Sequence, residues 1–290
     1  MGCLPRCGQW KWHDFKEASA IFIKRQIGKT VVLEIPAFSE TGLVQHGFST
    51  RLGGVSQEPF GSLDLGIYNE DDLSAIQANR LAFAETVGVP AAQIVCCHQV
   101  HGTKVAAVGS RDGGRGFLDG KTAIADTDGL MTNEPGVGLW ACFADCTPLF
   151  FLDPVKRVIA VSHAGWRGTV ARMGPVTVKR MQEVYGCAPQ DILAGIGPSI
   201  GACHYEVDAP VIAKVQQAFD FWPQVLHFTG PDRARLDLWE ANRLALLEAG
   251  LIGEHITVSG WCTYCFADYF YSYRRDNGRT GRMAALMSLQ

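Results

Sequence analysis

Apolar positions along the chain form short runs rich in β-branched and aromatic residues, and these runs mix with segments of helical spacing. The runs predict strands at 30–35, 44–50, 192–196 and 256–258. Apolar residues spaced three and four apart, with polar residues and breakers at the ends, predict helices at 72–87, 170–185, 210–219 and 237–249. Residues 94–108 are predicted to form one long strand or a pair of strands. Because strands and helices do not alternate strictly, we expect a mixed α/β fold, close to α+β, with central sheets.

Two apolar runs follow one another in the stretch 136–169, and each leads to a residue that can bind a metal or attack a substrate. The first, residues 137–151, is interrupted around Cys146 by an acid and a proline, which loosen regular strand pairing. The second, residues 157–162, delivers His163 and passes directly into a glycine-rich turn. Since α/β proteins usually place their chemistry at strand ends followed by such turns, this stretch is the predicted centre of the site.

Composition and charge limit the classes of function. The chain has 290 residues, of which 47% are hydrophobic, enough for a single domain with a large core. With a net charge of −3 and no long basic run, the chain lacks the positive charge that nucleic-acid-binding proteins use to hold phosphates. No apolar run approaches the roughly 20 residues of a membrane helix. The first residues also lack the apolar centre of a secretory signal, so we expect a cytoplasmic protein without a membrane partner.

Ten cysteines are many for such a chain, but they are too dilute for a disulfide scaffold. Several fall inside apolar runs, which is typical of buried thiols that act as small hydrophobic residues. Cys262 and Cys265 form a CxxC pair, yet no second ligand pair is evident beside them. We therefore interpret these two cysteines as buried thiols as well.

His101, Cys146 and His163 each lie beside a glycine or proline near a predicted strand end. Two imidazoles and one thiolate suit zinc, and three protein ligands leave a fourth position open, as in catalytic zinc sites. A metal held in this way can activate water at neutral pH. Spacing alone leaves two other interpretations open. The histidines can be ordinary hydrogen-bonded side chains, or Cys146 can be a nucleophile with His163 as its base, without a metal.

Arginines in glycine turns are candidate anion-binding residues. Arg51 and Arg167 each follow a predicted strand in such a turn, where a guanidinium can hold a phosphate through two hydrogen bonds. Four further arginines lie near the C-terminus, and for these a solvated loop with local ion pairs is the commoner interpretation. Residues 197–201 match the GxSxG pattern of serine hydrolases, but no helix is predicted after them, so we treat the match as accidental.

Several longer motifs together resemble one protein family. The motifs are HGFSTRLGGVS (46–56), QVHG (99–102), DTDGLMT (126–132), ADCTPLFFLDP (144–154), SHAGWRGT (162–169), GPSIGACHYEV (197–207), CTYC (262–265) and SYRRDNGRTGR (272–282). In this order they resemble the family once called multicopper polyphenol oxidases or laccase-domain proteins. Members of that family are now mostly described as purine nucleoside phosphorylases. The resemblance begins near residue 36, so we expect residues 1–30 to be an N-terminal extension and residues 31–290 to be the domain.

The resemblance implies a metal site, a fold and an activity. The implied ligands are His101, Cys146 and His163, with zinc as the metal and copper as a possible substitute. The implied fold is a single α/β domain with central mixed sheets flanked by helices, similar to a deamidating toxin domain that uses a cysteine and a histidine. The implied activity is zinc-dependent phosphorolysis of adenosine, inosine, guanosine and methylthioadenosine, together with adenosine deamination. Arg51 and Arg167 are then candidate phosphate or ribose contacts, in a monomer or a small homo-oligomer.

Other functions remain as alternatives. Some bacterial members of the family are described as editing peptidoglycan precursors, which would suit a cysteine hydrolase or amidase with Cys146 as nucleophile and His163 as base. Polyphenol oxidation with copper is a further alternative, although the chain has eight histidines and no HxH pair of the kind that multicopper oxidases use. A third alternative is a zinc-binding interaction module without catalysis, which would have a closed fourth coordination position.

Overall fold

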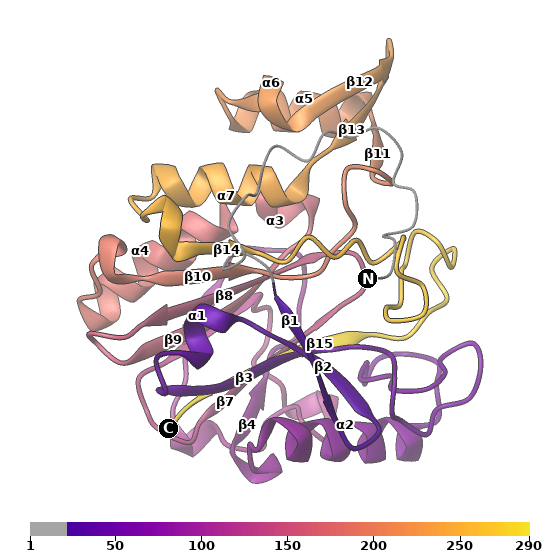
Figure 1. The fold of residues 1–290 in the computed structure, drawn as a ribbon, viewed down its shortest axis with the longest axis vertical. Helices are drawn as coiled ribbons and strands as arrows, with labels where there is room; N and C mark the ends of the chain where they lie inside the picture. The colour runs from indigo at the N-terminus through magenta and orange to yellow at the C-terminus, as the bar shows by residue number, and fades with distance from the viewer. Residues whose placement is uncertain (1–21) are drawn as a thin grey trace.

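The computed structural model describes residues 22–290 and contains three sheets with helices packed around them (Figure 1). The first sheet has the strand order β1 (Ile23–Ile27), β2 (Thr30–Glu34), β3 (Val44–Ser49), β15 (Met283–Leu289), β7 (Gly138–Phe143) and β4 (Ile94–Cys96). The second has the order β14 (Ile256–Val258), β10 (Leu193–Ile196), β8 (Thr147–Asp153), β9 (Val158–Ala164), β6 (Gly129–Thr132) and β5 (Val105–Ala107). A small third sheet consists of β11 (Glu206–Asp208), β13 (Arg233–Leu236) and β12 (Leu226–Gly230).

The helices cover the outer faces of these sheets. They are α1 (Pro36–Ser39), α2 (Leu73–Val87), α3 (Trp166–Val170), α4 (Met173–Tyr185), α5 (Ala209–Ala218), α6 (Trp222–Val225) and α7 (Leu238–Glu248). The first sheet packs its outer face on α2, whereas the second sheet packs on α4 and α7 (Figure 1). The third sheet shares its own core with α5, α6 and α7. No helix in the described part of the chain is long and apolar enough to cross a membrane.

The main core lies between the two large sheets, and side-chain alternation explains why their strands are apolar throughout. Phe150 and Leu152 of β8 point into this core, while Leu149 and Phe151 point outward to the layer of α4 and α7. Strand β7 divides its side chains between the two sides in the same way. A strand covered on both faces reads as a continuous apolar run rather than an alternating one, as the stretch 137–151 does.

The fold confirms the predicted mixed α/β architecture of a single domain and corrects several boundaries. Residues 94–108 form neither one strand nor a paired set, because β4 and β5 belong to different sheets and a crossover links them. The predicted helix 170–185 begins only at Met173, as α4, because Arg172 before it adopts a left-handed backbone conformation with φ of 61°. The glycine turn predicted around Arg167 instead forms the short helix α3. Residues 23–27 form strand β1, which pairs antiparallel with β2. The expected boundary between extension and domain at residue 30 stays a prediction.

Buried His46 makes the stability of the folded protein depend on pH. Its Nε2 accepts a hydrogen bond of 2.8 Å from the backbone amide of Ile35, and the side chain is only 6% exposed. Burial lowers the pKa of His46 from 6.5 to about 4. The unfolded chain therefore binds a proton at this position before the folded chain does.

We predict that the stability contributed by neutral His46 is complete above pH 6.5 and is lost as the pH falls toward 4. The shift corresponds to about 3 kcal/mol of unfolding free energy across this window. Denaturant unfolding of the wild type and His46→Gln at several pH values measures the effect. The difference in unfolding free energy between the two proteins should shrink as the pH falls from 6.5 to 4. A difference that is constant with pH would contradict this role for His46.

Candidate active site

Cys146 and His163 meet because they lie at the same end of two adjacent antiparallel strands. Cys146 immediately precedes β8, and His163 is the penultimate residue of β9. The register pairs Pro148 with His163 and Thr147 with Ala164. Strand β9 thus extends through Ala164, two residues beyond its predicted end. The hairpin alone is enough to bring the thiol and the imidazole to one edge of the second sheet.

His101 reaches the same edge from the crossover between the two large sheets. It follows β4, precedes β5, and has a left-handed backbone conformation with φ of 61°. His98, three residues earlier, contributes no ligand atom to this group and instead lies 3.8 Å from Asp126. The side chains of His98 and His101 therefore have different neighbours.

One fully buried carboxylate, Asp128, organises both halves of the site. Its Oδ1 accepts hydrogen bonds from the backbone amide of His101 at 3.0 Å and from Nδ1 of His163 at 2.9 Å. Its Oδ2 accepts from the amides of Gly102 at 2.7 Å and Val100 at 3.2 Å. Since a carboxylate only accepts, Nδ1 of His163 carries the proton, and Nε2 is left to face Cys146.

The three predicted residues form one compact group of ligand atoms. The ligand atoms of His101, Cys146 and His163 lie within 4.8 Å of one another, and Cys146 Sγ is 3.9 Å from His101 Nε2. His163 is buried, Cys146 is half-buried and His101 is exposed, so the group opens to solvent on the His101 side. Gly165 adjoins it closely, because a Cβ there would lie 2.8 Å from Cys146 Sγ. Only glycine leaves room for the sulfur at this position.

The electrostatics favour a thiolate beside an imidazolium. Burial opposes ionisation of Cys146, but the charge of His163 and a hydrogen bond with His101 lower the pKa of Cys146 to about 6. Burial likewise opposes protonation of His163, but the Cys146 charge and the Asp128 hydrogen bond raise the pKa of His163 to about 9. The pKa of Asp128 is lowered despite its burial, because His163 donates to it. At neutral pH the thiol is ready to act as a metal ligand or as a nucleophile.

The donor chemistry of this group fits a metal ion. Two imidazole nitrogens and one thiolate sulfur suit zinc or copper rather than magnesium. Asp128 adds the outer carboxylate that commonly holds a ligating histidine in one tautomer and orientation. A four-coordinate metal ion bound by these three side chains would have one position left for water or substrate.

Asp145, next to Cys146, is a structural acid. It has a left-handed conformation with φ of 78°, and its Oδ1 accepts a 2.6 Å hydrogen bond from the hydroxyl of Thr263. Its Oδ2 accepts from the Ser272 hydroxyl at 3.0 Å and from the Arg274 amide at 2.7 Å. Burial raises the pKa of Asp145 even though these bonds oppose it. Asp145 therefore fixes the backbone that carries Cys146.

A tyrosine and two arginines lie beside the site. Burial raises the pKa of Tyr205, and the Cys146 charge raises it further, while Arg274 and Arg167 oppose the shift. Arg274 donates its backbone amide to Asp145, the residue before Cys146, and Arg167 follows Gly165, which adjoins the sulfur of Cys146. Arg274 lies over the Tyr205 ring at 5.1 Å, and Arg167 lies over Trp166 at 4.4 Å in the first turn of α3. Both arginines are exposed, so their guanidinium groups remain accessible to an anion.

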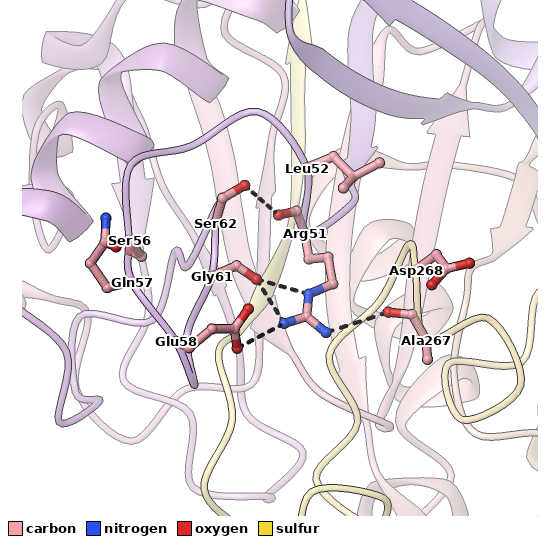
Figure 2. A pocket seen from close by; sticks show the side chains of 9 residues that line it. All are labelled: Arg51, Leu52, Ser56, Gln57, Glu58, Gly61, Ser62, Ala267 and Asp268. Atoms are coloured by element: carbon pink, nitrogen blue, oxygen red, sulfur yellow. Dashed lines mark hydrogen bonds and ion pairs between the residues drawn. The ribbon is translucent and has the colours of Figure 1, made fainter.

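Arg51 lies in a different pocket, of about 520 Å³, that none of the three ligand residues lines (Figure 2). Its Nε and Nη2 both donate to the carbonyl of Gly61, at 2.9 and 2.7 Å, and Nη1 donates to the carbonyl of Ala267. Its guanidinium also lies 4.7 Å from the centre of the Tyr271 ring. Most of its donors are therefore engaged with the protein itself, and a role in substrate binding stays a prediction.

The residues that surround and orient the three ligand residues were not predicted from the sequence. Asp128 stands in a DTDG motif that resembles any acidic turn, and only the fold brings it to His163 and His101. Tyr205 and Arg274 lie far from Cys146 in sequence, and only the fold bonds the Arg274 amide to Asp145 and places its guanidinium over the Tyr205 ring. The signal that could have identified Asp128 is its position directly before β6, whose register places Gly129 opposite Ser162 and so Asp128 beside His163.

Comparison with known proteins identifies similar chains over most of the length. A sequence profile of the family described as multi-copper polyphenol oxidoreductase laccase matches residues 45–290. A Bacillus subtilis protein named purine nucleoside phosphorylase YlmD is 43% identical over 244 residues, which are 84% of this chain and 88% of that protein. A Deinococcus radiodurans protein named purine nucleoside phosphorylase is 42% identical over 247 residues, which are 85% of this chain and 89% of that protein.

Solved structures show the same fold. The crystal structure of YlmD from Geobacillus stearothermophilus is 40% identical in sequence and has a TM-score of 0.88, covering 93% of this chain and 99% of that one. A Bacillus licheniformis protein described as hypothetical protein YfiH has the same TM-score of 0.88 at 35% identity, covering 92% of this chain and 99% of that one. The arrangement of sheets described above is therefore shared with these proteins.

Proposed function

The chain belongs to the multi-copper polyphenol oxidoreductase laccase family, and on this premise we propose that it is a zinc-dependent purine nucleoside phosphorylase. The substrates are adenosine, inosine, guanosine and methylthioadenosine together with phosphate, and the same site deaminates adenosine. Relatives named purine nucleoside phosphorylase support the reaction class. The observation that carries the proposal is the convergence of the ligand atoms of His101, Cys146 and His163 within 4.8 Å of one another, with Asp128 hydrogen-bonded to His163.

Phosphorolysis forms a bond between a phosphate oxygen and C1′ of the ribose, and it breaks the bond between C1′ and the purine nitrogen. The purine leaves with the bonding electron pair and takes up a proton. Zinc, when bound by His101, Cys146 and His163, would supply a Lewis acid that stabilises developing negative charge. Asp128 holds the proton on Nδ1 of His163 and so keeps Nε2 directed at the site.

The phosphate needs cationic partners, and Arg274 and Arg167 are the candidates beside Cys146. Both are exposed, and Arg167 lies two residues after Gly165, which adjoins the sulfur of Cys146. Arg274 is fixed at its base, because its backbone amide donates to Asp145 and its Nη1 donates to the Glu206 carbonyl at 2.9 Å. Two positioned guanidinium groups can neutralise phosphate and orient it for attack. Adenosine deamination forms a bond between C6 and the oxygen of water and breaks the bond between C6 and the amino nitrogen, which leaves as ammonia with protons from the water. This reaction requires solvent access, which the exposed His101 side provides.

A cysteine hydrolase or amidase acting on peptidoglycan precursors is the second candidate, and the electrostatics of the site favour it specifically. A Cys146 pKa of about 6 and a His163 pKa of about 9 describe the thiolate and imidazolium of a cysteine nucleophile and its base. Asp128 would then be the third, orienting member. Zinc bound to Cys146 would occupy the thiolate, so the two functions exclude each other at this site.

Polyphenol oxidation with copper has weaker support. The nitrogen and sulfur donors accept copper as readily as zinc, so copper bound to a preparation reports metal availability rather than function. The group of His101, Cys146 and His163 offers three ligand atoms, enough for one copper ion, whereas multicopper oxidases reduce dioxygen with several. A copper-loaded sample that oxidises phenols faster than it cleaves nucleosides would favour this alternative.

We predict that purified protein loaded with zinc converts inosine and phosphate to hypoxanthine and ribose 1-phosphate. Cys146→Ala should lower the rate by at least about 100-fold, because it removes the sulfur ligand. Cys187→Ala, which changes a buried thiol outside the site, is the matched control and should retain activity. Chromatography of the nucleoside, the free base and the sugar phosphate measures both.

Two outcomes would contradict this assignment. One is the absence of free base and of deaminated product from the wild type at full zinc occupancy. The other is an acyl adduct on Cys146 that mass spectrometry detects after incubation with peptide or amide substrates, which would support the cysteine hydrolase instead.

We further predict that Arg274→Ala raises the KM for phosphate by about 10-fold while leaving kcat nearly unchanged, because the lost charge-assisted bonds act in the bound ground state. Arg167→Ala should act in the same direction. Arg180→Ala is the control, since this arginine lies on α4 and pairs with Glu183 at 2.8 Å. Phosphate-dependent initial rates measure the effect, and Arg51→Ala tests the more distant candidate in the same assay. An unchanged KM in Arg274→Ala and Arg167→Ala would remove both from the phosphate site.

A further inference from the structure

A second group of metal-ligand side chains lies on the loops that follow strands β10 and β14. Cys203 and His204 come from the first loop, and Cys262 and Cys265 come from the second. The two strands are parallel neighbours, with Ile196 opposite Val258, so both loops leave the same edge of the sheet. The sequence alone does not reveal the other two ligands of the CxxC pair. Cys203 and His204 precede that pair by about 60 residues, and only the parallel pairing of β10 with β14 brings the four residues together.

The distances within this group resemble the edges of a zinc coordination tetrahedron. The sulfurs of Cys203 and Cys265 are 3.5 Å apart, and Nδ1 of His204 lies 3.3 Å from each of them. The ligand atoms of all four residues lie within 4.8 Å of one another. Around a zinc ion with ordinary bond lengths, two sulfurs are about 3.8 Å apart and a sulfur and a nitrogen about 3.5 Å. A disulfide would need sulfurs about 2.05 Å apart.

The surroundings of the group also suit a bound metal. Cys262 is buried, and its sulfur accepts a hydrogen bond from the backbone amide of Gly201 at 3.3 Å, as metal thiolates commonly do. The His204 ring is stacked on Tyr264 at 4.1 Å with an interplanar angle of 13°, which fixes its orientation. The remaining ligands are half-buried.

We propose that Cys203, His204, Cys262 and Cys265 bind a structural zinc ion, separate from the three-residue site. Three thiolates and one imidazole form a closed set of four protein ligands, which is typical of structural rather than catalytic zinc. The two groups share no residue, so each takes its own ion. The proposal of this second site does not depend on the phosphorolysis proposed above.

The second site also stabilises the backbone that carries Cys146. Thr263, between the two CxxC cysteines, donates to Asp145 through its hydroxyl, and the amide of Ile200 donates to the Asp145 carbonyl at 3.0 Å. Both loops therefore hold Asp145, the residue before Cys146. A metal ion bound by both loops would hold them in the relative position that these two hydrogen bonds need.

Metal analysis of full-length protein purified under reducing conditions tests the proposal. The wild type should contain about two zinc ions per chain, and Cys146→Ala and Cys265→Ser about one each. Cys187→Ser is the matched control and should keep the wild-type content, because this thiol belongs to neither group. An unchanged zinc content in Cys265→Ser would overturn the proposal.

X-ray absorption of the zinc retained by Cys146→Ala gives a second readout that leaves the proposed ligands intact. The expected first shell contains about three sulfurs and one nitrogen. This measurement decides the question even where Cys265→Ser fails to fold. A shell of nitrogen and oxygen alone, a Cys146→Ala protein without zinc, or a Cys203–Cys265 disulfide in the purified protein would each contradict the site. None of these outcomes depends on whether the protein cleaves nucleosides.

Discussion

The carboxylate of Asp128 is the interaction on which the candidate active site depends. It accepts hydrogen bonds from the backbone on either side of His101 and from the ring of His163, and so it joins the crossover loop to strand β9. These four hydrogen bonds use the acceptor positions of the fully buried carboxylate. They replace the water that its negative charge would otherwise need. The same contacts hold His101 in a left-handed conformation and direct Nε2 of His163 toward Cys146.

The fold places this carboxylate and the three ligand residues at one edge of the second sheet. The β8–β9 hairpin brings the thiol and the buried imidazole together, β6 delivers Asp128, and the crossover from β4 to β5 delivers His101. The neighbouring loops after β10 and β14 then fix Asp145 from the other side. One sheet edge thus carries both groups of metal-ligand residues, and the large apolar core between the sheets keeps that edge rigid.

The sequence predicted the parts of the site that depend on local pattern. Cys146 and His163 follow from interrupted apolar runs, because a short connection between two strands makes an antiparallel hairpin, whose strand ends meet. His101 was a candidate because it lies beside Gly102, but the sequence could not show that it meets Cys146 and His163, since the crossover that carries it joins two sheets. Asp128, Tyr205 and the partnership of Cys203 with Cys265 depend on contacts between distant segments. Parallel pairing of β10 with β14 is one such contact, and a single sequence contains no sign of it.

The role of Asp128 in organising the site is tested most directly by the catalytic efficiency of Asp128→Asn with inosine and phosphate in excess zinc. Asparagine keeps the shape of the side chain but cannot be the negatively charged acceptor for both the amides and the His163 ring. We expect kcat/KM of Asp128→Asn to fall by about 10- to 100-fold relative to the wild type. Asp126→Asn, which changes the exposed acid two residues earlier beside His98, should behave like the wild type. Wild-type efficiency in Asp128→Asn would contradict the claim that this carboxylate organises the site.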